Sequence, residues 1–119
     1  MRLLVVEEDD LIATSVDFRL RKHGFVIERV VGGETAIAAV NRALPDIMII
    51  ASKLTDMNGL ELVAFLHKQY PDLIMVYMAE IEAWEEIMRS IQLGARDFVL
   101  KPYKPDELLI RLKILLKVQ

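Results

Sequence analysis

The sequence contains no cysteine and no long apolar run. Without cysteine, a disulfide framework, a thiolate metal site and a cysteine nucleophile are all excluded. No stretch approaches the roughly 20 apolar residues of a membrane-spanning helix, and the first residues, MRLLVVEEDD, end in four acids, unlike a signal peptide. We therefore expect a cytoplasmic protein.

The chain also lacks a strong charge imbalance and the glycine patterns of nucleotide sites. With 15 basic and 18 acidic residues, its formal net charge of −3 gives no electrostatic reason for a direct nucleic-acid or membrane partner. Neither a GxGxxG pattern nor a P-loop is present, which argues against a small nucleotide-binding or catalytic protein. Other proteins are thus the expected partners, and no enzymatic activity is predicted.

Short apolar runs alternate with segments of helical period along the whole chain. We expect strands at 3–6, 25–31, 46–51, 72–78 and 97–100, and helices at 11–23, 34–44, 59–70, 81–93 and 105–117. Such alternation favours a parallel sheet, because parallel neighbours need a crossover and a helix usually supplies it. Residues 1–119 are therefore predicted to form one doubly wound α/β domain, a three-layer α/β/α sandwich.

Charged residues stand at the ends of the first and fifth predicted strands. Glu7 and Glu8 offer carboxylate oxygens of the kind that Mg²⁺ prefers, while the acids at 9–10 also fit a helix start. Lys101 supplies a point charge, either for a phosphoryl oxygen or as a counter-ion for the acids. The bond before Pro102 is a candidate for the cis form.

Together these features resemble the receiver domain of two-component response regulators. The resemblance covers essentially the whole chain and rests on LLVVEEDD, PDIMIIASKLTDMNGLEL, PDLIMVYMA and GARDFVLKPYKPDELLIRL. It implies a flavodoxin-like sheet of five parallel strands in the order 2-1-3-4-5, with five helices. It also implies a signalling mechanism: two acids bind Mg²⁺, and an aspartate at the end of the third strand accepts a phosphoryl group. A hydroxyl residue on the fourth strand, an aromatic on the fifth and a lysine respond to it.

Four of these positions keep their chemistry in this sequence. The acids fall on Glu7 and Glu8, the lysine on Lys101 and the switch aromatic on Phe98. Mg²⁺ is nevertheless doubtful, because Glu8 is longer than the usual aspartate and Lys53 stands where a backbone carbonyl would ligate the metal. We expect Lys53 or Lys101 to lie among the acids as an internal cation; alternatively, Lys53 simply points into solvent.

Two positions have lost their chemistry. The phosphoacceptor falls on Ala51 and the hydroxyl residue on Met78, so the usual acyl phosphate cannot form. Ser52, Thr55 and Asp56 lie in the same loop as substitute acceptors, but Ser52 should point away from the position of Ala51 and Asp56 is several residues from the strand end. A natural loss is favoured over an engineered alanine, because Met78 departs at the same time.

The expected output surface comprises the helix at 81–93, the strand at 97–100 and the helix at 105–117. Met78 either holds Phe98 in one rotamer and biases this surface, or packs as an ordinary core residue. Some charges resemble the pattern with which receivers of winged-helix transcription factors form two-fold dimers. The candidate interface residues are Trp84, Met88, Asp97, Lys104 and Arg111.

The sequence thus predicts an atypical receiver that acts without aspartate phosphorylation, as a protein-interaction or dimerisation module. It would control an attached or partner output, above all transcription, as the N-terminal part of a longer regulator whose DNA-binding domain lies outside these residues. The alternatives are a phospho-switch with an unconventional acceptor and a receiver whose acceptor was replaced by engineering.

Overall fold

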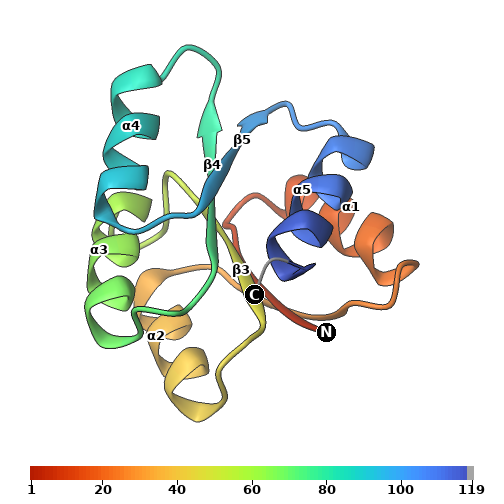
Figure 1. Ribbon diagram of the computed structural model, residues 1–119, viewed down its shortest axis with the longest axis horizontal. Coiled ribbons are helices and arrows are strands. Elements are labelled where there is room, and N and C mark those ends of the chain that lie inside the picture. The colour runs from red at the N-terminus through yellow and green to blue at the C-terminus, as the bar shows by residue number, and fades with distance from the viewer. Residues whose placement is uncertain (118–119) are drawn as a thin grey trace.

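Five parallel strands form one sheet between two layers of helices in the computed structural model, which describes residues 1–117 (Figure 1). The strands are β1 (Arg2–Val6), β2 (Val26–Val30), β3 (Ile47–Ala51), β4 (Met75–Glu80) and β5 (Asp97–Lys101). The helices are α1 (Asp10–Arg21), α2 (Gly33–Arg42), α3 (Gly59–Gln69), α4 (Trp84–Leu93) and α5 (Pro105–Lys117). The strand order is β2-β1-β3-β4-β5, with every neighbouring pair parallel, so the predicted fold class is confirmed.

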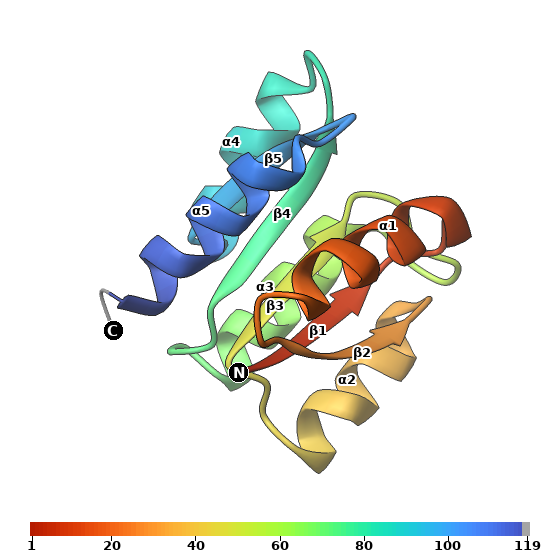
Figure 2. The ribbon, with the colours of Figure 1, turned by 90° about the vertical axis from the view of Figure 1, so that its right-hand side faces the viewer.

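The apolar core lies on both faces of the sheet, because side chains alternate along each strand. Helices α2, α3 and α4 cover the face that carries Met48 and Ile50, and helices α1 and α5 cover the face that carries Ile47 and Ile49 (Figures 1 and 2). β3 is buried at every position, as expected for a central strand covered on both sides. Within residues 1–117, no helix is both long and apolar enough to cross a membrane.

The fourth strand and helix differ most from their predicted boundaries. β4 runs from Met75 to Glu80 rather than over 72–78, and α4 begins at Trp84 rather than at residue 81. Glu82 has a φ of 69°, a left-handed conformation that a helix cannot contain, so the helix starts only after it. A short, partly exposed connection therefore precedes α4.

Helix α3 starts directly against the end of β3. The Gly59 N–H donates to the Ser52 carbonyl at 2.7 Å, and a Cβ at Gly59 would lie only 2.2 Å from the Ala51 carbonyl oxygen. Asn58 caps the helix by accepting from the backbone N–H of Glu61. This close approach fixes the loop that follows β3 at the carboxyl edge of the sheet.

Candidate functional site

An ion pair between the ends of β1 and β5 is the central feature of the carboxyl edge. Lys101 Nζ lies 2.9 Å from Glu7 Oε1, and the side chains of Lys101 and Glu7 are 15% and 3% exposed. Because β3 and β4 lie between β1 and β5 in the sheet, this pair spans the edge at which Ala51 ends β3. The Lys101–Pro102 peptide bond is cis, as the sequence suggested.

The backbone and carboxylate of Glu7 are held by several further contacts. Its N–H donates to the Val30 carbonyl at 3.0 Å, and its carbonyl accepts from Arg29 Nε at 2.9 Å. Oε2 accepts from the Asp9 N–H at 3.2 Å, whereas Oε1 makes no hydrogen bond of favourable angle within residues 1–117. This buried oxygen therefore depends on the positive charge of Lys101.

The other acids after β1 do not join the ion pair. Glu8 is exposed. Asp9 is the N-cap of α1 and accepts from two backbone N–H groups of its first turn, and Asp10 pairs with Arg29 at 2.8 Å. Asp9 and Asp10 thus serve the start of the helix, the alternative that the sequence left open for them.

Lys53 lies apart from the acids. It is exposed and forms an isolated β-bridge with Asn58, and no ion pair of Lys53 occurs in the described part of the chain. Of the two lysines considered from the sequence, Lys101 is the one that meets Glu7.

These residues do not assemble a divalent-cation site of the kind the resemblance implies. Glu7 is engaged by Lys101, Glu8 is exposed, and the side chain of Ala51 contains no ligand atom. Between residues 1 and 117, no three acidic or histidine side chains are grouped so that they could hold a metal ion. The arrangement fits Mg²⁺ poorly, and the lysine ammonium group balances the buried carboxylate.

The position of the expected phosphoacceptor is apolar. Ala51 and Met78 face each other in the register of β3 and β4, and both are buried at 1% exposure. Ser52 follows Ala51 with its side chain buried and its N–H bound to the Met78 carbonyl at 3.1 Å. Neither Ala51 nor Met78 offers an oxygen that could accept or bind a phosphoryl group.

Thr55 and Asp56, in the loop after β3, attach that loop to α2. The Asp56 carboxylate accepts from the N–H groups of Gly33 at 2.7 Å and Glu34 at 3.0 Å. These bonds, led by the one from Glu34, lower the pKa of Asp56. The Thr55 hydroxyl donates to the Val31 carbonyl at 3.3 Å. Both side chains therefore have structural partners.

In the sheet register Phe98 is the neighbour of Tyr77 rather than of Met78, an arrangement that favours the second alternative for Met78, ordinary core packing. Tyr77 pairs with Phe98 in the register of β4 and β5, whereas Met78 pairs with Val99. Phe98 packs on the core of the α2–α4 face, and Met78 belongs to the core of the opposite face. A shift of one residue along a strand moves a side chain to the other face. Met78 is thus a core residue beside α1 and α5.

Sequence reasoning missed Tyr77 as a functional candidate. The side chain is fully buried, and its hydroxyl donates to Glu86 Oε1 at 2.6 Å. Burial and, secondarily, the Glu86 carboxylate raise the pKa of Tyr77 well above its usual range. A hydroxyl-bearing aromatic within the apolar run Met75–Ala79 of β4 was the available signal.

Two of the three charged interface candidates, Asp97 and Arg111, are paired with each other. Arg111 Nη1 donates to both carboxylate oxygens of Asp97 at 2.9 Å, and Arg111 also meets Glu107. The hydrogen bond that Arg111 donates to Asp97 raises the pKa of Arg111. The Arg111 guanidinium lies 5.6 Å from the centroid of the Phe98 ring, within the range of a cation–π contact.

The apolar interface candidates are exposed. Trp84 is 54% and Met88 61% exposed, both on α4, and Lys104 is exposed just before α5.

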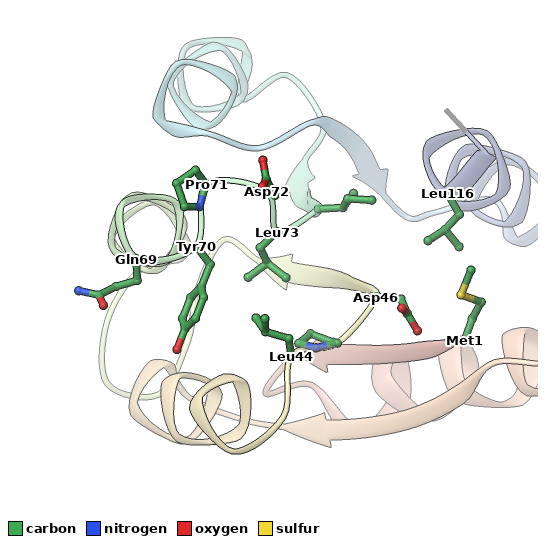
Figure 3. A pocket seen from close by; sticks show the side chains of 11 residues that line it. Met1, Leu44, Asp46, Gln69, Tyr70, Pro71, Asp72, Leu73 and Leu116 are labelled. Atoms are coloured by element: carbon green, nitrogen blue, oxygen red, sulfur yellow. The ribbon is translucent and has the colours of Figure 1, made fainter. Parts of the chain in front are cut away.

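A cavity of about 540 Å³ lies at the opposite, amino edge of the sheet, where Leu44, Tyr70 and Leu73 line it (Figure 3). None of the predicted site residues reaches that cavity.

A doubly wound 2-1-3-4-5 sheet with a buried lysine–carboxylate pair at its carboxyl edge defines a flavodoxin-like domain of the receiver type. The chain belongs to the response regulator receiver domain family, whose sequence model matches residues 3–113. It is therefore a receiver domain of two-component signalling systems, and both fold and family agree with the resemblance.

Curated relatives of the chain are response regulators. It is 32% identical over 117 residues to the two-component response regulator PhoP of Pseudomonas aeruginosa, covering 98% of this chain and 52% of PhoP. It is 30% identical over 116 residues to the DNA-binding response regulator MtrA of Mycolicibacterium smegmatis, covering 98% and 50%. The chain thus spans about half the length of the curated relatives it matches.

Solved structures of receiver domains have the same fold. The receiver domain of NtrX from Brucella abortus matches with a TM-score of 0.94 and 28% identity, covering 98% of this chain and 99% of that one. A CheY-like receiver domain protein from Methanospirillum hungatei matches with a TM-score of 0.91 and 27% identity, covering 98% and 93%.

Proposed function

We propose that this receiver domain signals without phosphorylation of an aspartate at the end of β3. The observation that carries the proposal is the combination of Ala51 at that position with a lysine already bound to a buried acid, Lys101 to Glu7 at 2.9 Å. The side chain that would form the acyl phosphate is missing, and the cation that would meet the phosphoryl group has another partner.

The domain would act through a DNA-binding output. Its curated relatives are about twice as long, and they include a probable transcriptional regulatory protein, TcrX, and the DNA-binding response regulator MtrA. We infer that residues 1–119 are the N-terminal receiver part of a longer cytoplasmic regulator, and that the receiver controls transcription by bringing two copies together.

The surface for this contact would be formed by α4, β5 and α5. Six large apolar side chains are exposed along α4, its approach and α5: Ile81, Trp84, Met88, Ile91, Ile110 and Ile114. Exposed apolar patches of this kind mark interaction sites. Glu82 and Glu85 are exposed near α4 and Lys113 on α5, so a two-fold pairing that sets α4 against the partner copy's α5 would bring opposite charges together.

Sedimentation of the isolated domain over a concentration series tests the dimer. We expect self-association at micromolar concentration, and we expect Met88→Glu to weaken it at least tenfold because a charge would enter the apolar contact. Phe18→Glu is the matched control, since Phe18 is also 61% exposed but lies on α1. A wild type that stays monomeric well above micromolar concentration, or equal weakening by both variants, would rule out this interface.

Intact mass spectrometry after incubation with Mg²⁺ and acetyl phosphate tests the loss of the phospho-switch. We expect no phosphoryl gain on the wild type. A gain on Ala51→Asp alone would show that only the acceptor is missing; no gain on either would show that the edge around Glu8, Lys53 and Met78 has lost competence as well. Phosphorylation of the wild type would refute the proposal and favour the unconventional acceptor.

A further inference from the structure

Tyr77 connects the sheet to the first turn of α4. Its side chain is 0% exposed, and its hydroxyl donates to Glu86 Oε1 at 2.6 Å. Hydrogen bonds from a hydroxyl to a carboxylate are shorter and stronger than neutral ones. Because Glu86 is only partly buried, this bond runs from the core to the helix that carries Trp84 and Met88.

The Tyr77 ring is itself immobilised. It stands between Ile50 of β3 and Phe98 of β5 in the register of the sheet. A Cβ on Gly59 would come within 3.0 Å of its Cε1 atom, so the ring also packs against the start of α3. A ring confined in this way holds its hydroxyl at a fixed point, close to the end of β3.

Helix α4 has few other anchors at its N-terminus. Its N-cap residue, Ala83, provides no side-chain hydrogen bond, and Glu82 before it is in the left-handed conformation. Only Ile87 and Ser90 are buried within the helix. Among the described residues, the bond from Tyr77 to Glu86 is the one side-chain hydrogen bond that links the first turn of α4 to the sheet.

We propose that the Tyr77–Glu86 hydrogen bond fixes α4 in one position, so that Tyr77 acts as a positioning residue for the α4 side of the interaction surface. The link to the interface rests on the proposed function, whereas the fixing of α4 does not. The Tyr77 hydroxyl then sets the output surface without phosphate. Tyr77 directly precedes Met78 in β4, and its side chain belongs to the core on the opposite face of the sheet.

Hydrogen exchange of the backbone amides tests whether this bond holds α4. In Tyr77→Phe the exchange of the α4 amides is expected to become about tenfold faster, the effect of losing one bond to a charged group. The amides of α1 and β3 should keep their protection, which also shows that the variant is folded. The fluorescence of Trp84, the only tryptophan of the chain, reports on the same helix turn and should shift.

Tyr103→Phe is the matched control, because the Tyr103 hydroxyl also makes a 2.6 Å hydrogen bond, but to Ser15 of α1 rather than to a residue of α4. It should leave α4 exchange and Trp84 emission unchanged. On the acceptor side, Glu86→Gln keeps a carbonyl oxygen and should preserve most of the protection, while Glu86→Ala should reproduce Tyr77→Phe. The double variant Tyr77→Phe/Glu86→Ala should then lose no more exchange protection in α4 than either single variant.

Two results would overturn the proposal. The first is an α4 exchange rate in Tyr77→Phe that rises no more than in the control. The second is an additive effect of Tyr77→Phe and Glu86→Ala, which would mean that the two side chains act independently. Sedimentation of the same variants gives a separate readout. If amide exchange in α4 becomes faster while self-association stays unchanged, the hydrogen bond fixes α4 but has no role at the interface.

Discussion

Replacing Lys101 by methionine should destabilise the domain strongly. Methionine keeps much of the apolar stem but leaves the Glu7 carboxylate, 3% exposed, without its 2.9 Å cation. Removing one partner of a buried ion pair costs about 3–5 kcal/mol. Because Lys101 retains 15% exposure and water can reach its place, we expect about 3 kcal/mol, the lower end of that range.

Urea unfolding followed by Trp84 fluorescence measures this loss. The urea concentration at the midpoint should fall, while the slope of the unfolding free energy against urea concentration should stay constant. This combination indicates a change in stability rather than in compactness. Lys53→Met removes an exposed lysine from the same edge and should stay within about 0.5 kcal/mol of the wild type. The double variant Glu7→Leu/Lys101→Met should regain most of the loss, because no charge remains buried.

A loss below about 1 kcal/mol in Lys101→Met, the size of an exposed pair, would refute this account. It would show that Glu7 is hydrated or neutralised in another way, so that Lys101 would be free to meet a phosphoryl group. A double variant no more stable than Lys101→Met would equally contradict the view that the unpaired charge is the cause.

Further predictions concern the loop after β3. Gly59→Ala should lower the free energy of unfolding by at least about 3 kcal/mol, because the added Cβ would lie 2.2 Å from the backbone oxygen of Ala51. Gly33→Ala should lower it less, because the added Cβ meets only the flexible side chain of Met57. Thermal unfolding of the two variants measures which is less stable. The lowered pKa of Asp56 means that its bonds to α2 stabilise the fold above the usual carboxyl pKa, and that this stabilisation disappears as the pH falls through the lowered value. The advantage of the wild type over Asp56→Ala should therefore shrink in acid, and equal differences at neutral and acid pH would contradict this assignment.

The order of elements could be predicted from local patterns because those patterns depend on short-range chemistry. Alternating strand and helix periods predicted five βα units and hence a parallel sheet. The positions of Glu7, Ala51 and Lys101 at strand ends followed from the same pattern, since the carboxyl ends of parallel strands share one edge.

Boundaries and partners across the fold were less accessible. The late start of α4 depends on the left-handed conformation of Glu82. The sequence does not predict this conformation, because a glutamate seldom adopts it. Whether Lys53 or Lys101 would meet Glu7 depended on where the loop after β3 and the end of β5 place these two side chains, and local sequence does not encode that placement.

The sequence by itself determined the βα alternation, the apolar strands and the alanine, Ala51, at the end of the third strand, because these are properties of residue types and their spacing. Only the tertiary structure decided that Lys101 reaches Glu7, that Phe98 faces Tyr77 rather than Met78, and that Tyr77 binds Glu86. Such contacts join elements far apart in the chain, so they depend on strand register and helix placement, which the packing of the whole domain sets.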